Sequence, residues 1–284
     1  MKTATYHLLD VFTDTRFAGN QLAVFLEADA LDTRTMQAIA HELNLAETVF
    51  LSTATAPGHY PMRIFTPTEE LDFAGHPTVG TAQLLAELGL VEREQTLVLA
   101  PPVGELSVRF SNKKATFTTA RAACVTPGPL SRASAAALLG LEPSQVLSEP
   151  VISSCGLAFH LVELADVDAL GAVEIAAAEW KAMITPSGAE QVYLYVQGSS
   201  DNTGATIRSR MFSMHDSLCE DPATGSAAAA LSGYLATLTS THRWTIHQGV
   251  EMGRPSVIET AMDGDLIRVG GRAVRVGKGE IHVE

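Results

Sequence analysis

Two short motifs place side chains that can exchange or bind protons directly before a proline. HPTVGTA begins at His76 and DPATGSA begins at Asp221, and both follow the pattern X-Pro-x-x-Gly-(Thr/Ser)-Ala. Histidine titrates nearest to neutral pH, and an aspartate carboxylate accepts hydrogen bonds. A third group, Glu47, stands where a helical pattern meets an apolar strand pattern, and partial burial there can raise the pKa of a carboxyl. These three residues are the candidates for acid/base chemistry.

The two motifs belong to an internal repeat. Arg63-Ile-Phe-Thr returns as Arg210-Met-Phe-Ser, and Ala46-Glu-Thr-Val-Phe-Leu returns as Ala189-Glu-Gln-Val-Tyr-Leu. Because the matches are collinear and nearly constant in spacing, they indicate two copies of one structural unit. The repeat also aligns Glu47 with Glu190, so by itself it leaves open whether one, both or neither glutamate is catalytic.

Two strongly apolar helices follow the motifs. These are the segments 77–89 and 222–238, and the second is apolar nearly all round. A helix without a polar face must be buried on every side. Amphipathic patterns predict further helices at 33–44, 131–140 and 174–183. Segments rich in β-branched and aromatic residues predict strands at 6–12, 22–26, 46–51, 62–66, 96–100, 105–110, 115–119, 191–196 and 207–213.

This pattern predicts an α+β protein of two pseudo-symmetric domains, each a rolled β-sheet or barrel around one central apolar helix. The turn at 127–134 is the expected neighbourhood of the link between them. Proline favours the first helical position, so Pro77 and Pro222 predict that His76 and Asp221 are the N-caps of the central helices. Such helix starts offer backbone N–H groups to an anionic or carbonyl substrate, and a cleft between domains is the expected place for it.

Each candidate also has a structural interpretation. Aspartate caps helices without any chemistry, and a single histidine can be a buried structural side chain. A glutamate at a strand end is usually solvated. The pattern of the residues alone therefore leaves the roles of Glu47, His76 and Asp221 open.

Composition excludes several classes of partner. The chain has 284 residues with 19 Lys and Arg against 32 Asp and Glu, a net charge of −13, so nucleic acid and anionic membrane surfaces are not expected. No apolar run approaches the ~18 residues of a membrane helix. Phosphate-binding glycine loops and metal-ligand histidine spacings are missing, so we expect neither cofactor nor metal. Three cysteines without a CxxC pair and a start without a secretory signal favour the cytoplasm.

The longer motifs resemble those of a known family. They are DVFTDTRFAGNQLAVF, NLAETVF, RIFTPTEELDFAGHPTVGTA, RSRMFSMHDSLCEDPATGSAAAAL, HQGVEMGRPSVI and GKGEIHVE. Together they are specific and run nearly from end to end of the chain. On these motifs the sequence resembles the PhzF family, the phenazine biosynthesis isomerases and their relatives, which share the diaminopimelate epimerase-like fold.

The resemblance implies a fold and an assembly. It predicts an N-terminal barrel domain at 1–125, completed by a last strand at 276–284, and a C-terminal barrel domain at 126–275. It also implies a homodimer that acts on a small molecule. The expected activity is a cofactor-independent isomerase that transfers a proton on a small, anionic, unsaturated metabolite similar to trans-2,3-dihydro-3-hydroxyanthranilate, as in phenazine biosynthesis.

The resemblance also implies roles for single residues. Glu47 in NLAE matches the family's general acid/base, which favours it over Glu190. His76 and Asp221 match the other catalytic positions of the family. The residues implied to bind substrate are Asn20, Gly75, Gly80, Gly225 and Ser226. The chain departs from the family's pattern at Met214, His215 and Cys219, in the loop before EDPATG, which bears on the identity of the substrate.

Two other functions stay open. Racemases of the same fold use a cysteine at each of the two helix starts, but here His76 and Asp221 occupy those positions and Cys124, Cys155 and Cys219 stand elsewhere. A ligand-binding or interaction protein that keeps the fold without turnover is the second alternative. Exchange of a substrate C–H with solvent separates an isomerase from such a protein.

Overall fold

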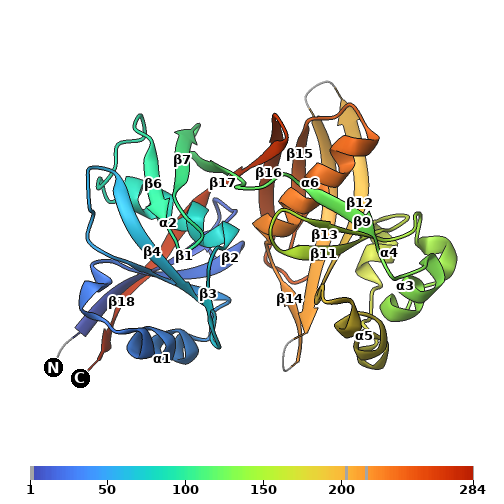
Figure 1. Cartoon of the computed structure of the whole chain (residues 1–284), viewed down its shortest axis with the longest axis horizontal. Helices are drawn as coiled ribbons and strands as arrows, with labels where there is room; N and C mark the ends of the chain where they lie inside the picture. Colours follow the sequence, from blue (N-terminus) through green and yellow to red (C-terminus); the bar gives the residue numbers. More distant parts are fainter. Residues whose placement is uncertain (1–2, 202–203, 215–216, 284) are drawn as a thin grey trace. The chain divides into compact units, whose positions relative to one another are not determined.

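The chain forms two compact units, each with its own strands and its own buried helix. The structure is a computed structural model, and it describes residues 3–201, 204–214 and 217–283. The first unit is Met1–Thr118 together with Gly270–Glu284, and the second is Thr119–Val269. Both mix helices with curled sheets, which confirms the α+β class (Figure 1). The boundaries inferred from the sequence, 1–125 with 276–284 and 126–275, stay a prediction.

The first unit consists mainly of antiparallel strand pairs, with two parallel pairs among them. Strand β1 pairs antiparallel with both β18 and β2. The pair β2–β3 is parallel, β3–β4 and β4–β5 are antiparallel, β4–β6 is parallel, and β6–β7–β8 is antiparallel. The bounds are β1 Thr3–Val11, β2 Asn20–Phe25, β3 Glu47–Leu51, β4 His59–Phe65, β5 Glu70–Leu71, β6 Leu97–Ala100, β7 Leu106–Ser111, β8 Lys114–Thr118 and β18 Ala273–His282.

Helix α2 (Gly75–Glu87) is enclosed by these strands, as its sequence predicts. It packs against β1, β2, β3, β6, β8 and β18, and all of its residues from Gly75 to Leu85 are buried (Figure 1). The polar Gln83 is accommodated because its amide donates to the carbonyls of Lys113 and Gly271 and accepts from Arg93. Gly80 permits the close approach, since an added Cβ would lie 2.6 Å from Leu22 and 2.7 Å from Val11.

The amphipathic helix α1 (Thr33–Leu43) covers another part of this unit. Asp32 caps it by accepting from the backbone N–H of Thr35 at 2.8 Å. Its apolar face joins a cluster of buried side chains with stacked and edge-on aromatic rings, namely Phe25, Phe50 and Phe65. The short 3₁₀ turn η1 (Ala28–Ala30) precedes it.

The second unit has its own sheet. The pair β9–β10 is antiparallel, as is β10–β11, while β11–β12 is parallel. Strands β12–β13 and β13–β14 pair antiparallel, β13–β15 is parallel and β15–β16 is antiparallel. The bounds are β9 Cys124–Pro127, β10 Val151–Ser154, β11 Ala158–Glu163, β12 Gln191–Asp201, β13 Gly204–Met214, β14 Leu218–Asp221, β15 Arg243–Gln248, β16 Ser256–Asp263 and, at the end of this unit, β17 Leu266–Gly271.

Helix α6 (Gly225–Leu238) is the buried helix of the second unit. It packs against β9, β10, β11, β15 and β16, and its polar Ser232 bonds Thr260 at 2.5 Å in the interior. Shorter helices pack on a second cluster around Trp180, which is 1% exposed. They are α3 (Arg132–Leu139), α4 (Val167–Gly171) and α5 (Ala177–Met183), with the turns η2 (Pro143–Gln145) and η3 (Thr185–Ser187).

Both central helices begin elsewhere than the prolines predict. The N-cap of α2 is Ala74, so His76 is the second helical residue and Pro77 the third. Proline fits here because the N–H groups of the whole first turn lack intrahelical acceptors, not only the first. The N-cap of α6 is Thr224, so Asp221 lies before the helix, at the end of β14. The prediction that His76 and Asp221 are N-caps is wrong.

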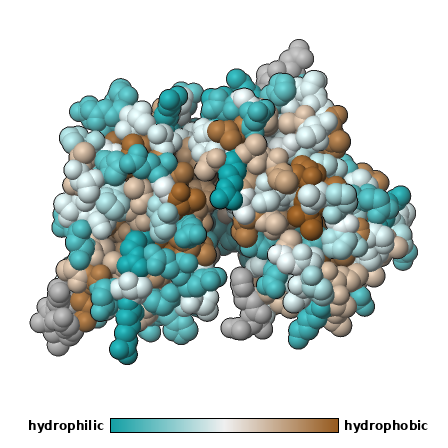
Figure 2. Space-filling view, viewed as in Figure 1, coloured by the Kyte–Doolittle hydropathy of each residue, from teal (hydrophilic) through white to brown (hydrophobic). Residues whose placement is uncertain are grey.

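The face of the molecule shown in Figure 2 carries both hydrophilic and hydrophobic residues. Figure 2 shows hydrophilic residues spread over the viewed face, with hydrophobic residues in small patches among them. Within the described ranges, no helix is long and apolar enough to cross a membrane. The large hydrophobic side chain with the greatest exposure among those found is Phe17, at 73%.

We predict that Gly233→Ala, within α6, destabilises the protein. Alanine has the higher helix propensity by about 1 kcal/mol, but its Cβ would lie 2.2 Å from the Cβ of Ala123, an atom that cannot rotate away. Overpacking of this kind costs about 1–3 kcal/mol. Urea unfolding measures the change.

The matched control is Gly171→Ala at the end of α4, where an added Cβ meets nothing within 4 Å. This variant should match or slightly exceed the wild type in stability. Equal stability of the two variants would contradict the packing of α6 against Ala123.

Candidate active site

Glu47 and His76 meet inside the first unit. Glu47 is the first residue of β3, and His76 reaches it from the first turn of α2. Nε2 of His76 lies 3.3 Å from Oε2 of Glu47, and the two side chains are only 5% and 17% exposed. The sequence predicted both residues as candidates, and the structure brings them into contact.

Burial keeps the His76 ring neutral. Enclosure in the strands lowers its pKa from 6.5 to about 3, and a hydrogen bond to the backbone of Gln21 opposes this shift only in part. A bond that raises the pKa is one that the ring donates, so the backbone carbonyl of Gln21 accepts it. Nε2 faces Glu47, which assigns the donated proton to Nδ1. Nε2 of the neutral ring is therefore the acceptor that points at the glutamate.

A strained loop leads into Asn20, the first residue of β2. Phe12, Phe17 and Gly19 have φ angles of 62°, 70° and 66°, a region that costs side-chain-bearing residues energy. The buried carboxylate of Asp10 fixes this loop by accepting from the backbone N–H of Phe17 at 2.6 Å. Gly19 is required, because a Cβ there would lie 2.3 Å from the carbonyl oxygen of Val11. The loop thus places Asn20, which is 2% exposed, directly before Gln21.

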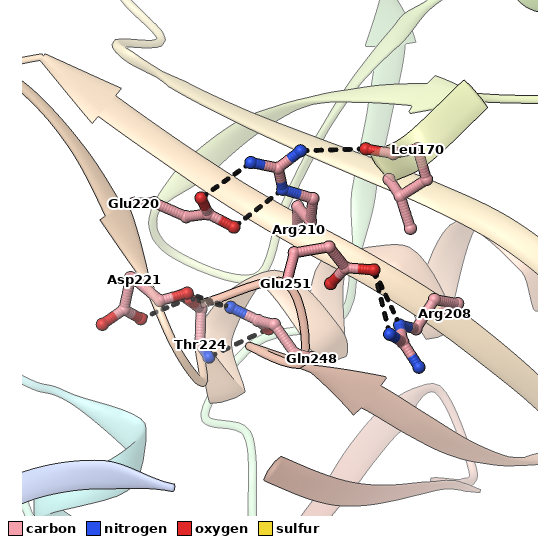
Figure 3. A network of polar contacts seen from close by, with 8 residues as sticks. All are labelled: Leu170, Arg208, Arg210, Glu220, Asp221, Thr224, Gln248 and Glu251. Carbon is pink, nitrogen blue, oxygen red and sulfur yellow. Dashed lines mark hydrogen bonds and ion pairs between the residues drawn. The ribbon is translucent and has the colours of Figure 1, made fainter. Parts of the chain in front are cut away.

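Asp221 lies in a polar network of the second unit (Figure 3). The hydroxyl of Thr224 donates to its Oδ2, and the amide of Gln248 donates to its backbone carbonyl at 2.8 Å. Gly225 and Ser226 follow as the first two residues of α6. The sequence analysis did not single out Gln248, although this residue stands in the motif HQGVEMGRPSVI. Thr224 could have been found, because threonine is a favoured N-cap and stands inside DPATG.

The other candidate residues differ in their position in the fold and in their exposure. Gly75 is the first residue of α2 and Gly80 lies inside it, where helix packing accounts for the missing side chain. Glu190 is exposed, unlike Glu47. The candidate residues divide between the two units. Asn20, Glu47, Gly75, His76 and Gly80 belong to the first unit, and Asp221, Gly225 and Ser226 belong to the second.

None of the three cysteines belongs to the first turn of a central helix. Cys124 lies in β9 and Cys219 in β14, both exposed, and Cys155 follows β10. Burial raises the pKa of the Cys155 thiol to about 11, which disfavours the reactive thiolate. Met214 ends β13, whereas His215 lies outside the described residues. Within the residues that the structure describes, no group of three His, Cys, Asp or Glu side chains could hold a metal ion.

Comparison with known proteins identifies the family. The profile of the phenazine biosynthesis-like protein family (PhzC-PhzF) matches residues 9–279. An uncharacterized isomerase of Mesorhizobium japonicum is 36% identical over 304 residues, with all of both chains covered. The trans-2,3-dihydro-3-hydroxyanthranilate isomerase of Pseudomonas fluorescens is 32% identical over 287 residues, covering 97% of this chain and 98% of that protein.

A solved structure supports the same assignment. The PhzF-family phenazine biosynthesis protein of Bacillus anthracis matches with a TM-score of 0.87 at 25% identity, covering 99% of this chain and 100% of that one. The chain therefore belongs to the phenazine biosynthesis-like protein family, an isomerase-type family, and the resemblance read from its motifs is confirmed.

We predict that His76 makes the stability of the protein pH-dependent below pH 6.5. The unfolded ring binds a proton near 6.5, whereas the pKa of the folded ring is lowered to about 3. Between these values the unfolded state binds more protons, so the free energy of unfolding falls as pH falls, by at most about 1.4 kcal/mol per pH unit from this residue. Above pH 6.5 the contribution is fully present and constant.

Urea unfolding of wild type and His76→Gln from pH 4.5 to 7.5 measures this contribution. The variant should show the shallower slope. His41→Gln, at an exposed histidine, is the control and should keep the slope of the wild type. A wild-type slope in His76→Gln would show that His76 is not the group responsible.

Proposed function

We propose that the protein is a cofactor-independent isomerase in which Glu47 is the general acid/base. The substrate class is a small, anionic, unsaturated metabolite related to trans-2,3-dihydro-3-hydroxyanthranilate, the compound in the name of the Pseudomonas fluorescens relative. The observation that carries the proposal is the contact of 3.3 Å between Glu47 and the buried neutral ring of His76. The absence of metal and cofactor and the homodimer stay predictions.

The contact suits a glutamate that must hold a proton for a short time. Nε2 of His76 is an acceptor, so it can bond the carboxyl of Glu47 only when that carboxyl carries a proton. A hydrogen bond to the neutral acid favours that form. Glu47 is thereby suited to take a proton from an activated carbon and to keep it until it is returned.

The proposed reaction is a balanced proton shift. The C–H bond at one carbon breaks as an O–H bond forms on Glu47, and the electron pair moves into the conjugated system of the substrate. The proton then leaves Glu47 and forms a C–H bond at another carbon, so nothing is oxidised or reduced. General acid/base catalysis by a positioned carboxyl contributes about 10²–10⁴-fold.

The helix starts supply the proposed binding groups. Helices α1, α3 and α4 are capped by side chains of Asp32, Ser131 and Asp166, whereas no side-chain cap bond is found on α2, on α6 or on the short helix α5. First-turn N–H groups carry the positive end of the helix dipole and bind anions. In the proposal, these groups, with Ser226 and Asn20, hold the charged substituents of the substrate and Asp221 accepts from its donors.

We also infer that the two units are copies of one structural unit. In the first unit the pairs β1–β2, β3–β4, β4–β5 and β6–β7 are antiparallel, and β2–β3 and β4–β6 are parallel. The second unit has the same order of pairs: β10–β11, β12–β13, β13–β14 and β15–β16 are antiparallel, and β11–β12 and β13–β15 are parallel. Arg63 pairs with Glu70 and stacks on Phe65. Arg210 does the same with Glu220 and Phe212.

The strand register points to a different residue of the second unit as the counterpart of Glu47. Arg63 lies opposite Phe50 and Arg210 opposite Leu194, so Phe50 corresponds to Leu194 and Glu47 to Gln191. The sequence match pointed to Glu190, one residue earlier, because AET and AEQ align without a gap. In this inference, only the first unit carries a carboxylate at the position of Glu47.

We predict that Glu47→Gln loses about 10³-fold in kcat, because the amide has the shape of the acid but cannot carry the proton. The measurement is conversion of trans-2,3-dihydro-3-hydroxyanthranilate in D₂O, followed by absorbance and by mass spectrometry. Glu190→Gln, the exposed neighbour that the repeat suggested, should convert substrate at the wild-type rate.

The possible outcomes separate the alternatives. Retention of most turnover by Glu47→Gln would refute the role of Glu47. A wild type that converts no substrate, exchanges no C–H of any compound in a metabolite library, and only gains melting temperature with a ligand would be a binding protein. Conversion of a different compound with solvent deuterium uptake would keep the isomerase and replace the substrate.

A further inference from the structure

Asp221 is bonded by a buried side chain that lies far away along the chain. Gln248, at the end of β15, is 0% exposed and donates through Nε2 to the carbonyl of Asp221 at 2.8 Å and to the hydroxyl of Thr224 at 3.0 Å. Its Oε1 accepts from the backbone N–H of Thr224 at 3.1 Å. Figure 3 shows the amide between β14 and the start of α6, in contact with both.

The directions of these bonds are fixed by their partners. The carbonyl of Asp221 can only accept and the N–H of Thr224 can only donate, so the amide of Gln248 has one possible orientation. The Thr224 hydroxyl accepts from Gln248 and passes its own proton to Oδ2 of Asp221. A chain of donors therefore runs from Gln248 through Thr224 to the carboxylate.

Tyr193 of β12 fixes the other side of the Gln248 amide. Its hydroxyl donates to Oε1 at 3.1 Å and lies 2.9 Å from the hydroxyl of Ser209. Burial and the negative charge of Asp221 both raise the pKa of Tyr193, so this hydroxyl keeps its proton at neutral pH. The amide is thus satisfied on all sides and cannot turn.

The hydrogen bond from Thr224 to Asp221 takes the place of a cap that would stabilise helix α6. Thr224 is the N-cap of α6, yet its hydroxyl does not bond the first turn of its own helix. A threonine cap typically contributes about 0.5–2 kcal/mol. Ser131 of α3 and Asp32 of α1 make such caps in this chain. The hydroxyl of Thr224 is given to Asp221 instead, which is the pattern expected where position matters more than helix stability.

We propose that Thr224 and Gln248 are positioning residues that hold Asp221 in one rotamer and in its carboxylate form, ready to accept from a donor group of the substrate. The role of Asp221 as a substrate acceptor rests on the proposed function. The bonds that position it do not depend on which substrate is bound.

The test compares Thr224→Val, which keeps the shape but removes the hydroxyl, with Thr224→Ser, which keeps the hydroxyl. In protein labelled with ¹³C at aspartate carboxyls, the Asp221 signal is assigned with Asp221→Asn and titrated. Thr224→Val should move its midpoint to higher pH, because the carboxylate has lost a donor, and should lower kcat about 10- to 100-fold. Thr224→Ser should restore both.

The control variant is Thr260→Val. It breaks another buried hydroxyl contact, with Ser232 of α6, without touching Asp221. This variant should lose stability but keep the Asp221 titration and kcat of the wild type. If Thr260→Val and Thr224→Val lowered kcat equally, Thr224 would contribute only to the stability of the protein, and the positioning role would be refuted.

The outcomes separate this inference from the proposed function. An unmoved Asp221 midpoint in Thr224→Val, or failure of Thr224→Ser to restore it, would overturn the inference whatever the substrate is. A moved midpoint with unchanged kcat, on a substrate that the wild type converts, would overturn the positioning role and leave the isomerase standing. A wild type without turnover would end the proposed function, while the titration still decides whether Thr224 holds the carboxylate.

Discussion

The enclosure of helix α2 by strands is the constraint on which the chemistry of the first unit depends. A helix with eleven consecutive buried residues, Gly75 to Leu85, must be apolar or internally satisfied at nearly every position. His76 is the titratable exception, and enclosure determines its state by lowering its pKa to about 3. The neutral ring then presents an acceptor to Glu47, so the acid form of the glutamate gains a partner. Fold and proposed chemistry are connected through desolvation of one ring.

The two motifs of the repeat are alike in sequence but differ in local structure. HPTVGTA lies inside α2 from its second residue, whereas only the last three residues of DPATGSA lie in α6. His76 is therefore turned inward with the helix, while Asp221 ends a strand and accepts hydrogen bonds from the side chains of Thr224 and of Gln248 in β15. In the inferred duplication, the two copies serve two purposes in this way, because a shift in where the helix begins changes which groups surround the first motif residue.

Much of the fold could be predicted from local pattern. The segments 46–51 and 191–196 read as strands and coincide with β3 and most of β12, and 33–44 reads as the helix α1. The burial of α2 and α6 follows from their lack of a polar face. The helix starts could not be predicted from proline alone, because Pro77 lies inside the first turn of α2 whereas Pro222 lies before the N-cap of α6.

The candidate site could be predicted only where motifs carry it. Glu47, His76 and Asp221 stand in motifs and carry side chains that suit proton transfer. Tyr193 is an ordinary strand residue in the sequence, and Gln248 stands in the motif HQGVEMGRPSVI but has a neutral amide that does not mark it as a candidate. The contacts of Gln248 with Tyr193 and with Thr224 require the parallel pairing of β13 with β15, which joins segments far apart along the chain. Long-range pairing of this kind leaves no local periodicity in the residues it brings together.

The neutral state of His76 bears on how a proton can be returned to the correct carbon. A two-thiol racemase separates the donor from the acceptor, so the incoming proton arises on a group other than the one that removed the first. In the proposed mechanism one glutamate does both, and the abstracted proton must stay on Glu47 while the electrons of the substrate rearrange. A protonated histidine would compete by donating to the carboxylate and favouring its charged form, whereas a neutral acceptor favours the acid. Burial of His76 is thus the feature that suits a single carboxyl to carry one proton between two carbons.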